Sequence, residues 1–226
     1  MSEGLLRQHK ADTLPLLRLL HLADSALPVG AAAHSFGLES LIEDGLLAAG
    51  GLESFCADYL EENGALEAAY CLSAYRLAQQ AEPLAAAWLD LNRRLSARRP
   101  ARESREASLA LGRRFLRLAL DLGLPAAVEG DSHHCAAFGL TAALAGVDER
   151  SAVAAWLHQS LAAVLSAAQR LAPLGQTRAA AILWSLKPRI SAIADSAGGA
   201  EPPCFMPGPE VASMRHSRLA TRLFIS

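Results

Sequence analysis

The sequence predicts an all-α protein, a single-domain multi-helix bundle that ends in an irregular C-terminal docking tail. Its 226 residues include 47 Ala and 40 Leu, against 6 Val, 5 Ile and 4 Thr. Ala and Leu favour helices, whereas strands favour β-branched and aromatic residues. The composition therefore excludes an all-β fold, and the hydrophobic fraction of 52% argues against a disordered chain.

Gly and Pro punctuation divides the chain into a flexible leader at 1–12, an all-α domain at 13–196, and a linker with a partner-docking tail at 197–226. The expected helices, in chain order, cover residues 14–23, 34–44, 52–80, 84–96, 101–122, 132–145, 149–172 and 176–194.

Capping and turn residues define the first two helices. Thr13 precedes the first helix, and Pro15 stands in its first turn. Pro28 disfavours helical geometry at the residue before it, and Gly30 follows. We therefore expect a loop over residues 25–33, and then a short helix that stops at Gly45.

Spacing and end signals define the remaining helices. An apolar residue recurs at positions i, i+3, i+4, i+7 and i+8 from Leu52, which is typical of an amphipathic helix. Gly123 and Gly146 each follow an expected helix end. Asp148 should cap the next helix, and Pro188 should bend or break the last one.

The stretch from residue 151 to 169 contains no charged side chain and nearly reaches the length that spans a bilayer. It nevertheless contains His158 and several other polar residues. Its large apolar side chains form one helical stripe, made of Val153, Trp156, Leu157, Leu161, Val164 and Leu165. We therefore expect a central core helix of a protein outside the membrane.

The last thirty residues differ in kind from the rest of the chain. Repeated Pro and Gly predict an irregular linker, and the end of the chain exposes Leu223, Phe224 and Ile225 without an expected helix. Such a tail must dock on the domain or become ordered on a partner.

Charge is segregated along the sequence. Residues 39–67 carry eight acidic residues and no Lys or Arg, whereas residues 93–117 carry nine Arg against two Glu. Two solvated helix faces would explain this, and so would steering of partners. A helical nucleic-acid-binding regulator that uses Arg93–Arg117 is an alternative function, although interleaved aromatic residues are lacking.

No enzyme signature is present: the phosphate-binding Gly-rich motifs, the nucleophile elbow and the zinc-protease motif are all missing. The best metal candidates are His133, His134 and Cys135, as in a metalloenzyme. Successive helical side chains point about 100° apart, so these three cannot converge on one ion, and a packed role is favoured. Four scattered Cys predict reduced thiols in a cytoplasmic protein.

Several motifs, taken together and in order, resemble the urease accessory protein UreF family. They cover nearly the whole chain: Leu22–Gly30, His34–Glu39, Arg102–Glu106, Leu111–Phe115, His133–Gly139, Leu171–Gln176, Ala212–His216 and Arg222–Phe224.

The resemblance implies an all-α, often dimeric protein without enzymatic activity or a cofactor of its own. Such a protein binds a UreD/UreH-type accessory protein, recruits the UreG-type GTPase and docks on apo-urease. The assembled complex then handles nickel and inserts it into the urease active site, with UreF as scaffold and regulator of the GTPase. No nucleic acid and no membrane take part.

The matching residues carry the expected partner contacts. They fall in three groups: Pro28, Gly30, His34, Ser35 and Glu39; Arg170, Pro173, Gly175 and Gln176; and Arg215, His216, Arg222, Leu223 and Phe224. For the first group plain turn geometry is an equal alternative, and Arg170 could instead cap helix carbonyls.

The chain departs from the family pattern at two places. Ala31 and Ala32 replace a second Gly and an aromatic residue, while Ala220 and Ile225 replace a tail Tyr and a penultimate Arg. We expect these changes to alter partner affinity and to leave the fold intact.

Overall fold

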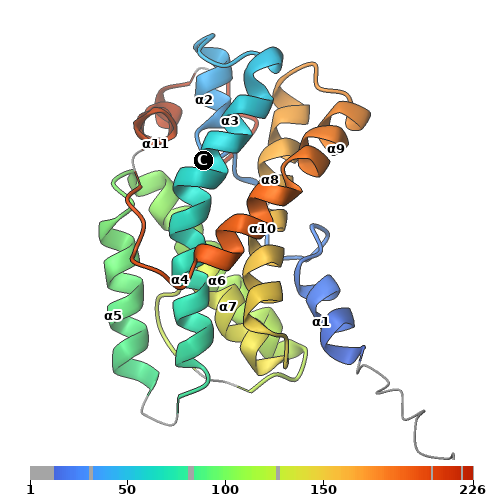
Figure 1. Ribbon diagram of the computed structural model, residues 1–226. Coiled ribbons are helices and arrows are strands. Elements are labelled where there is room, and N and C mark those ends of the chain that lie inside the picture. The colour runs from blue at the N-terminus through green and yellow to red at the C-terminus, as the bar shows by residue number, and fades with distance from the viewer. Residues whose placement is uncertain are drawn as a thin grey trace, which may run out of the picture.

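The computed structural model describes residues 13–30, 33–80, 84–125, 128–204, 206–219 and 221–225 (Figure 1). The predicted leader at 1–12 lies outside the described residues, as do Ala31, Ala32 and Ala220. Within the described residues the secondary structure is helical and contains no strand, which confirms the predicted fold class.

The helices lie close to the positions that the sequence predicts. In chain order they are α1 (Leu14–Leu22), α2 (Leu38–Glu43), η2 (Ala49–Gly51), α3 (Leu52–Tyr59), η3 (Leu60–Gly64), α4 (Ala65–Leu77), α5 (Leu84–Ala97), α6 (Arg102–Asp121), α7 (His134–Leu144), α8 (Glu149–Leu171), α9 (Gln176–Ser185), α10 (Lys187–Ser196), α11 (Pro207–Arg215) and η4 (His216–Arg218).

Helix α7 is the centre of the bundle and packs against α4, α6 and α8. Every residue from Cys135 to Ala143 is buried, so this helix has no solvent face. Its approach to α4 is close because Gly139 has no side chain: a Cβ there would lie 2.0 Å from the carbonyl oxygen of Cys71. The small residues of α7 thus allow neighbouring backbones to pack tightly around it.

Helix α8 runs beside α7, and all six residues of its predicted apolar stripe are buried. Its N-terminus is capped as expected, because the Asp148 carboxylate accepts a 2.8 Å hydrogen bond from the Ser151 amide. Among the described helices, α8 alone is long and apolar enough to span a membrane. Half of its most apolar stretch is buried within this fold, so α8 is a core helix of the bundle.

The predicted helix over 52–80 is continuous, as expected, but it changes geometry midway. Residues Leu60–Gly64 form one π-helical turn between α3 and α4. Gly64 faces Leu157 of α8, where an added Cβ would lie 3.3 Å from a side-chain carbon. Such insertions accommodate an extra residue without ending the helix.

One predicted helix start needs correction, and one predicted break is confirmed. The helix expected over 34–44 begins only at Leu38, because Phe36 and Gly37 have positive φ angles of 55° and 82°. This left-handed geometry interrupts a right-handed helix. The helix expected over 176–194 is broken into α9 and α10 at Leu186, just before Pro188, as the proline predicted.

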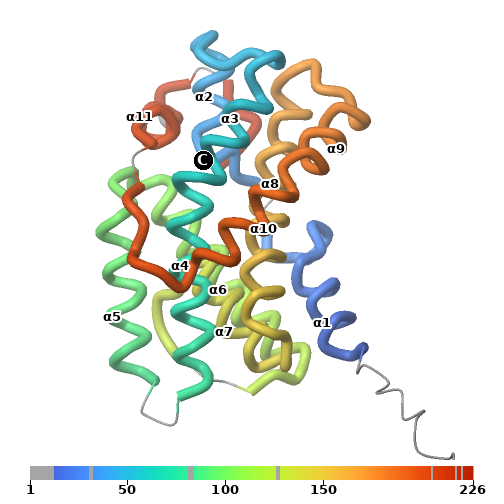
Figure 2. Tube along the Cα trace, in the orientation of Figure 1, coloured from blue at the N-terminus to red at the C-terminus, as the bar shows by residue number. Residues whose placement is uncertain are grey.

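The C-terminal segment is more ordered than predicted. The linker after α10 crosses α4 and α5 before it rises to α11 (Figure 2), and Glu201 on the way accepts a 2.9 Å hydrogen bond from Tyr70. Residues 207–215 then form α11, which packs on α2. The expectation that the tail has no helix is therefore wrong: Pro207 and Pro209 start a helix rather than prevent one.

Candidate interaction site at the C-terminal tail

The loop before α2 forms one wall of the tail-binding site. Pro28 is exposed, whereas Val29 is buried in the core. Gly30 and Gly37 both have a φ of 82°, and a Cβ on Gly37 would lie 2.5 Å from the carbonyl oxygen of Pro209 in α11. Glycine at position 37 is thus required both by its backbone conformation and by the close approach of the tail helix.

The Glu39 carboxylate at the start of α2 binds the tail at three points. It accepts hydrogen bonds from His216 Nε2 at 2.7 Å, from the Leu223 amide at 2.6 Å and from the Phe224 amide at 3.3 Å. Both Glu39 and His216 are buried. A single side chain of α2 therefore joins two parts of the C-terminal segment: the start of η4 and residues 223–224.

Two further contacts fix the last residues. The Phe224 ring is buried and lies 4.2 Å below the guanidinium carbon of Arg170, at the end of α8. The Ile225 amide donates a 2.8 Å hydrogen bond to the carbonyl of Ala33. Leu223 and Ile225 point outward, with 65% and 71% of their surfaces exposed.

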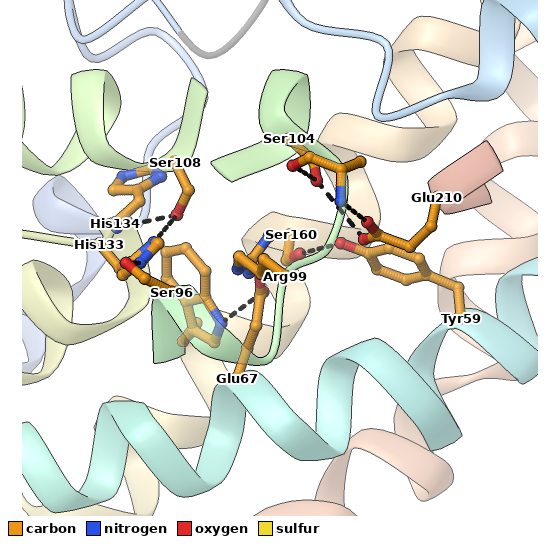
Figure 3. A network of polar contacts seen from close by, with 12 residues as sticks. Tyr59, Glu67, Ser96, Arg99, Ser104, Ser108, His133, His134, Ser160 and Glu210 are labelled. Carbon is orange, nitrogen blue, oxygen red and sulfur yellow. Dashed lines mark hydrogen bonds and ion pairs between the residues drawn. The ribbon is translucent and has the colours of Figure 1, made fainter. Parts of the chain in front are cut away.

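Helix α11 is held at both ends by charged contacts. Arg215 forms a 2.9 Å ion pair with Asp44 of the segment after α2. At the other end, the Glu210 carboxylate accepts a 2.7 Å hydrogen bond from the Ala101 amide, which caps α6 from outside (Figure 3). The tail thus bridges α2 and α6.

A buried polar network lies beneath this site, where α4, α8 and the α5–α6 turn meet (Figure 3). Arg99 donates to Glu67 Oε1, and the indole of Trp156 donates to Glu67 Oε2 at 3.2 Å. Nearby, the hydroxyls of Tyr59 and Ser160 are 2.9 Å apart. Burial, followed by the nearby Glu67, raises the pKa of Tyr59, so the phenol stays protonated.

The network borders a cavity of about 230 Å³ between α8 and the loop before α2. A second cavity of about 250 Å³ lies under α11 and shares Tyr59, Glu67 and Arg99 with the first. The C-terminal segment therefore covers one of the two cavities that border the buried ion pair.

Comparison with known proteins identifies the family. A family model described as UreF matches residues 47–187. The chain is 35% identical to the urease accessory protein UreF of a Nostoc species over 223 residues, which cover 93% of this chain and 95% of the relative. This chain belongs to the UreF family. The corresponding proteins of a Bacillus species and of Trichormus variabilis are 32% and 34% identical and cover 93% and 95% of this chain, and 99% and 100% of their own lengths.

In this UreF-family chain, several residues predicted to contact partners are internal. The structure buries five of them: His34, Ser35, Glu39, His216 and Phe224. The Glu39 carboxylate accepts hydrogen bonds from the His216 ring and from the Phe224 amide. Burial, followed by the nearby Arg114, lowers the pKa of His34. The expectation that one helix presents His34, Ser35 and Glu39 needs correction, because His34 and Ser35 precede α2. Glu39 lies on α2 and faces the tail.

The other predicted contact residues remain accessible. Pro173, Gly175 and Gln176 are exposed at the turn between α8 and α9, beside the buried Leu174. Arg222 is exposed in the tail. Arg170 has a role that the sequence did not indicate, because it covers the Phe224 ring. Contact of these residues with a partner stays a prediction.

The three metal candidates of this UreF-family chain, His133, His134 and Cys135, are packed inside the bundle. The His133 ring nitrogens lie 3.0 Å from Ser108 Oγ and 2.9 Å from Ser96 Oγ. His134 packs edge-on against Trp156, with ring centres 4.9 Å apart. Cys135 is buried, and burial raises its pKa. Among the described residues, no group of three His, Cys, Asp or Glu side chains is placed to hold a metal ion.

The basic segment folds into α5 and α6, and many of its arginines have acidic partners in the same chain. The ion pairs are Arg94–Asp90, Arg98–Glu201, Arg99–Glu67, Arg102–Glu106, Arg113–Asp131 and Arg117–Asp121. The acidic residues of the stretch 39–67 pair mainly with arginines in the C-terminal half of the chain: Glu53 with Arg178 and Glu61 with Arg189. The pairing of these arginines reduces the positive charge that the basic segment 93–117 offers to the phosphates of a nucleic acid.

The sequence did not indicate the pairing partners Asp44, Glu67 and Glu210. The one local signal was that Glu67 lies on the apolar face of a predicted helix. A carboxylate on such a face needs a buried donor, and only the folded chain shows that Arg99 provides it.

Proposed function

We propose that this UreF-family chain is a non-catalytic scaffold in urease maturation. It binds a UreD/UreH-type accessory protein, recruits and regulates the UreG-type GTPase, and docks on apo-urease in the cytoplasm as a homodimer. Nickel is the cargo of the assembled complex rather than a resident cofactor of this chain. The family membership supports the general role, and the geometry of the tail supports the mode of binding.

The observation that carries the proposal is the exposed end of the tail. Leu223 and Ile225 project outward from a backbone that Glu39 and Ala33 hold in place. Arg222 is exposed beside them. Two apolar side chains and an arginine on an ordered segment form a suitable interface core, because they can be buried on binding without first being arranged.

The turn between α8 and α9 offers a second surface. Pro173, Gly175 and Gln176 are exposed there, and Arg170 joins this turn to the tail through Phe224. Because both surfaces meet at one side chain, a partner bound to the tail can influence a second partner at the turn. This arrangement supports a scaffold that couples two partners.

The surroundings of the histidines support the assignment of nickel to the complex. Both ring nitrogens of His133 are within hydrogen-bond distance of serine hydroxyls. Binding a metal there would break these contacts inside the core. A surface formed with a partner is therefore the more favourable place for nickel transfer.

Co-purification tests the proposal. Tagged wild-type chain, co-expressed with UreD/UreH-type and UreG-type proteins, should retain both. The variant L223S/I225S should lose the accessory protein, whereas L122S, which alters an exposed leucine at the end of α6, should not. If all partners are folded and wild type retains none of them, the proposal is wrong.

A further inference from the structure

We propose that Glu39 is the positioning residue that holds the C-terminal tail in its partner-binding conformation. The inference rests on the proposed function, because it concerns the same tail, and it names the side chain that orders it. Glu39 lies 177 positions before His216 in sequence, yet the two side chains meet inside the fold.

The Glu39 carboxylate is held to the tail by three hydrogen-bond donors. His216 Nε2 and the amides of Leu223 and Phe224 all direct hydrogen toward one carboxylate. Only 5% of Glu39 is exposed, so water does not replace these donors when the tail is docked. A buried carboxylate without donors is costly, and a charge-assisted hydrogen bond is roughly twice as strong as a neutral one. Glu39 and the tail therefore stabilise each other.

The same contact sets which side chains face a partner. Because the amides of Leu223 and Phe224 bind Glu39, the ring of Phe224 turns inward under Arg170. The side chains of Leu223 and Ile225 then face solvent. A shift of one residue along the extended tail would bury Leu223 or Ile225 and expose the aromatic ring. Glu39 thus determines the register of the exposed tail.

Order in the free chain has a consequence for affinity. A partner that binds an already ordered tail avoids the entropic cost of ordering it. Glu39 is itself buried and offers almost no surface to a partner. Replacing it should therefore weaken partner binding through the conformation of the tail alone.

Hydrogen exchange of the full-length chain tests the first half of the proposal. In E39A, the amides of residues 222–225 should exchange about tenfold faster or more, which corresponds to the loss of one charge-assisted hydrogen bond. E39Q retains an acceptor oxygen and should give an intermediate rate. The matched control is E43A, which removes an exposed carboxylate from the same helix and should leave the tail unchanged.

Exchange in the core separates this role from a general loss of folding. Amides of α4 and α7 should keep their wild-type protection in E39A and E39Q. If E39A unfolds, E39Q decides, because it differs from wild type by one atom and one charge. Equal tail exchange in E39Q, E43A and wild type would then overturn the proposal.

Titration with the UreD/UreH-type protein tests the second half. E39A should bind about tenfold more weakly than E43A, as expected when an ordered segment becomes free. A mobile tail with unchanged affinity would overturn the positioning role. Failure of the wild-type chain to bind would instead refute the proposed function and this half of the inference, while the exchange rates independently decide whether Glu39 holds the tail.

Discussion

The guanidinium carbon of Arg170 lies 4.2 Å from the centre of the Phe224 ring. The last turn of the long core helix α8 thus covers an aromatic side chain from the end of the polypeptide. Phe224 belongs to the same hydrophobic cluster as Leu19 of α1 and Leu165 of α8. The tail is therefore packed on the core of the bundle, and replacing Arg170 should change the packing of the C-terminal residues.

Replacing Arg170 should loosen the tail. The variant R170M keeps an apolar stem over Phe224 but removes the cation–π attraction, which contributes about 0.5–2 kcal/mol. We expect faster hydrogen exchange at the amides of Phe224 and Ile225. The control R178M removes an arginine of α9 that is paired with Glu53. If R170M and R178M leave the tail equally protected, Arg170 does not hold it.

Breaking the buried ion pair should destabilise the whole bundle. E67L or R99M alone leaves a buried group without its partner, and each should lower the free energy of unfolding by about 3–5 kcal/mol. The double variant E67L/R99M removes both charges and should cost less than the two single changes added together. Urea denaturation of the four proteins measures this coupling. Strict additivity would show that the two side chains act independently.

Adding a methyl group to Gly139 should separate α4 from α7. The new Cβ would overlap the Cys71 carbonyl oxygen, 2.0 Å away, and both atoms belong to helices that cannot move independently. We expect G139A to cost about 1–3 kcal/mol, or more if the helices cannot adjust. G50A is the control, because a Cβ there meets nothing within 4 Å. Equal unfolding midpoints for G139A and G50A would contradict the close packing.

Mild acid should destabilise the protein through its buried histidines. Burial, followed by the nearby Arg99, lowers the pKa of His133 and His134 to about 3 from the ordinary value of 6.5. Between these values the unfolded chain binds more protons than the folded one. Stability should therefore fall as pH decreases from about 6.5, by up to about 1.4 kcal/mol per pH unit for each histidine.

Urea denaturation at pH 7.5, 6 and 5 measures this slope. His134 lies between the rings of Phe115 and Trp156, so H134F should keep the aromatic packing and give a shallower pH dependence. The control H21Q changes a histidine that is exposed at the end of α1. A slope in H134F as steep as in H21Q would rule out His134 as a source of acid sensitivity.

Much of the helical core could be predicted because its signals are local. Asp148 caps α8 through a contact with a residue three positions away, and Pro188 separates α9 from α10. The apolar stripe of α8 is buried in full. A helix brings such neighbours together by its own geometry, so spacing alone predicts them.

The site could be predicted only in part. The motifs drew attention to Glu39, His216 and Phe224, but they suggested three surfaces for partners. The structure brings these residues into contact with one another, across 177 positions between Glu39 and His216. Neither the helix of the tail nor the role of Arg170 was expected, because both depend on segments that meet only after folding.

Local sequence signals were enough to predict the helical class, most of the helices between α1 and α10, and the buried stripe of α8. These follow from residue propensity and from periodicity over a few turns. Three features of the tail depend instead on contacts between distant segments: its helix α11, its hydrogen bonds to Glu39, and the outward direction of Leu223 and Ile225 but not of Phe224. A buried carboxylate needs hydrogen-bond donors, and the donors of Glu39 come from residues about 180 positions away along the chain. Spacing within one helix therefore cannot identify them.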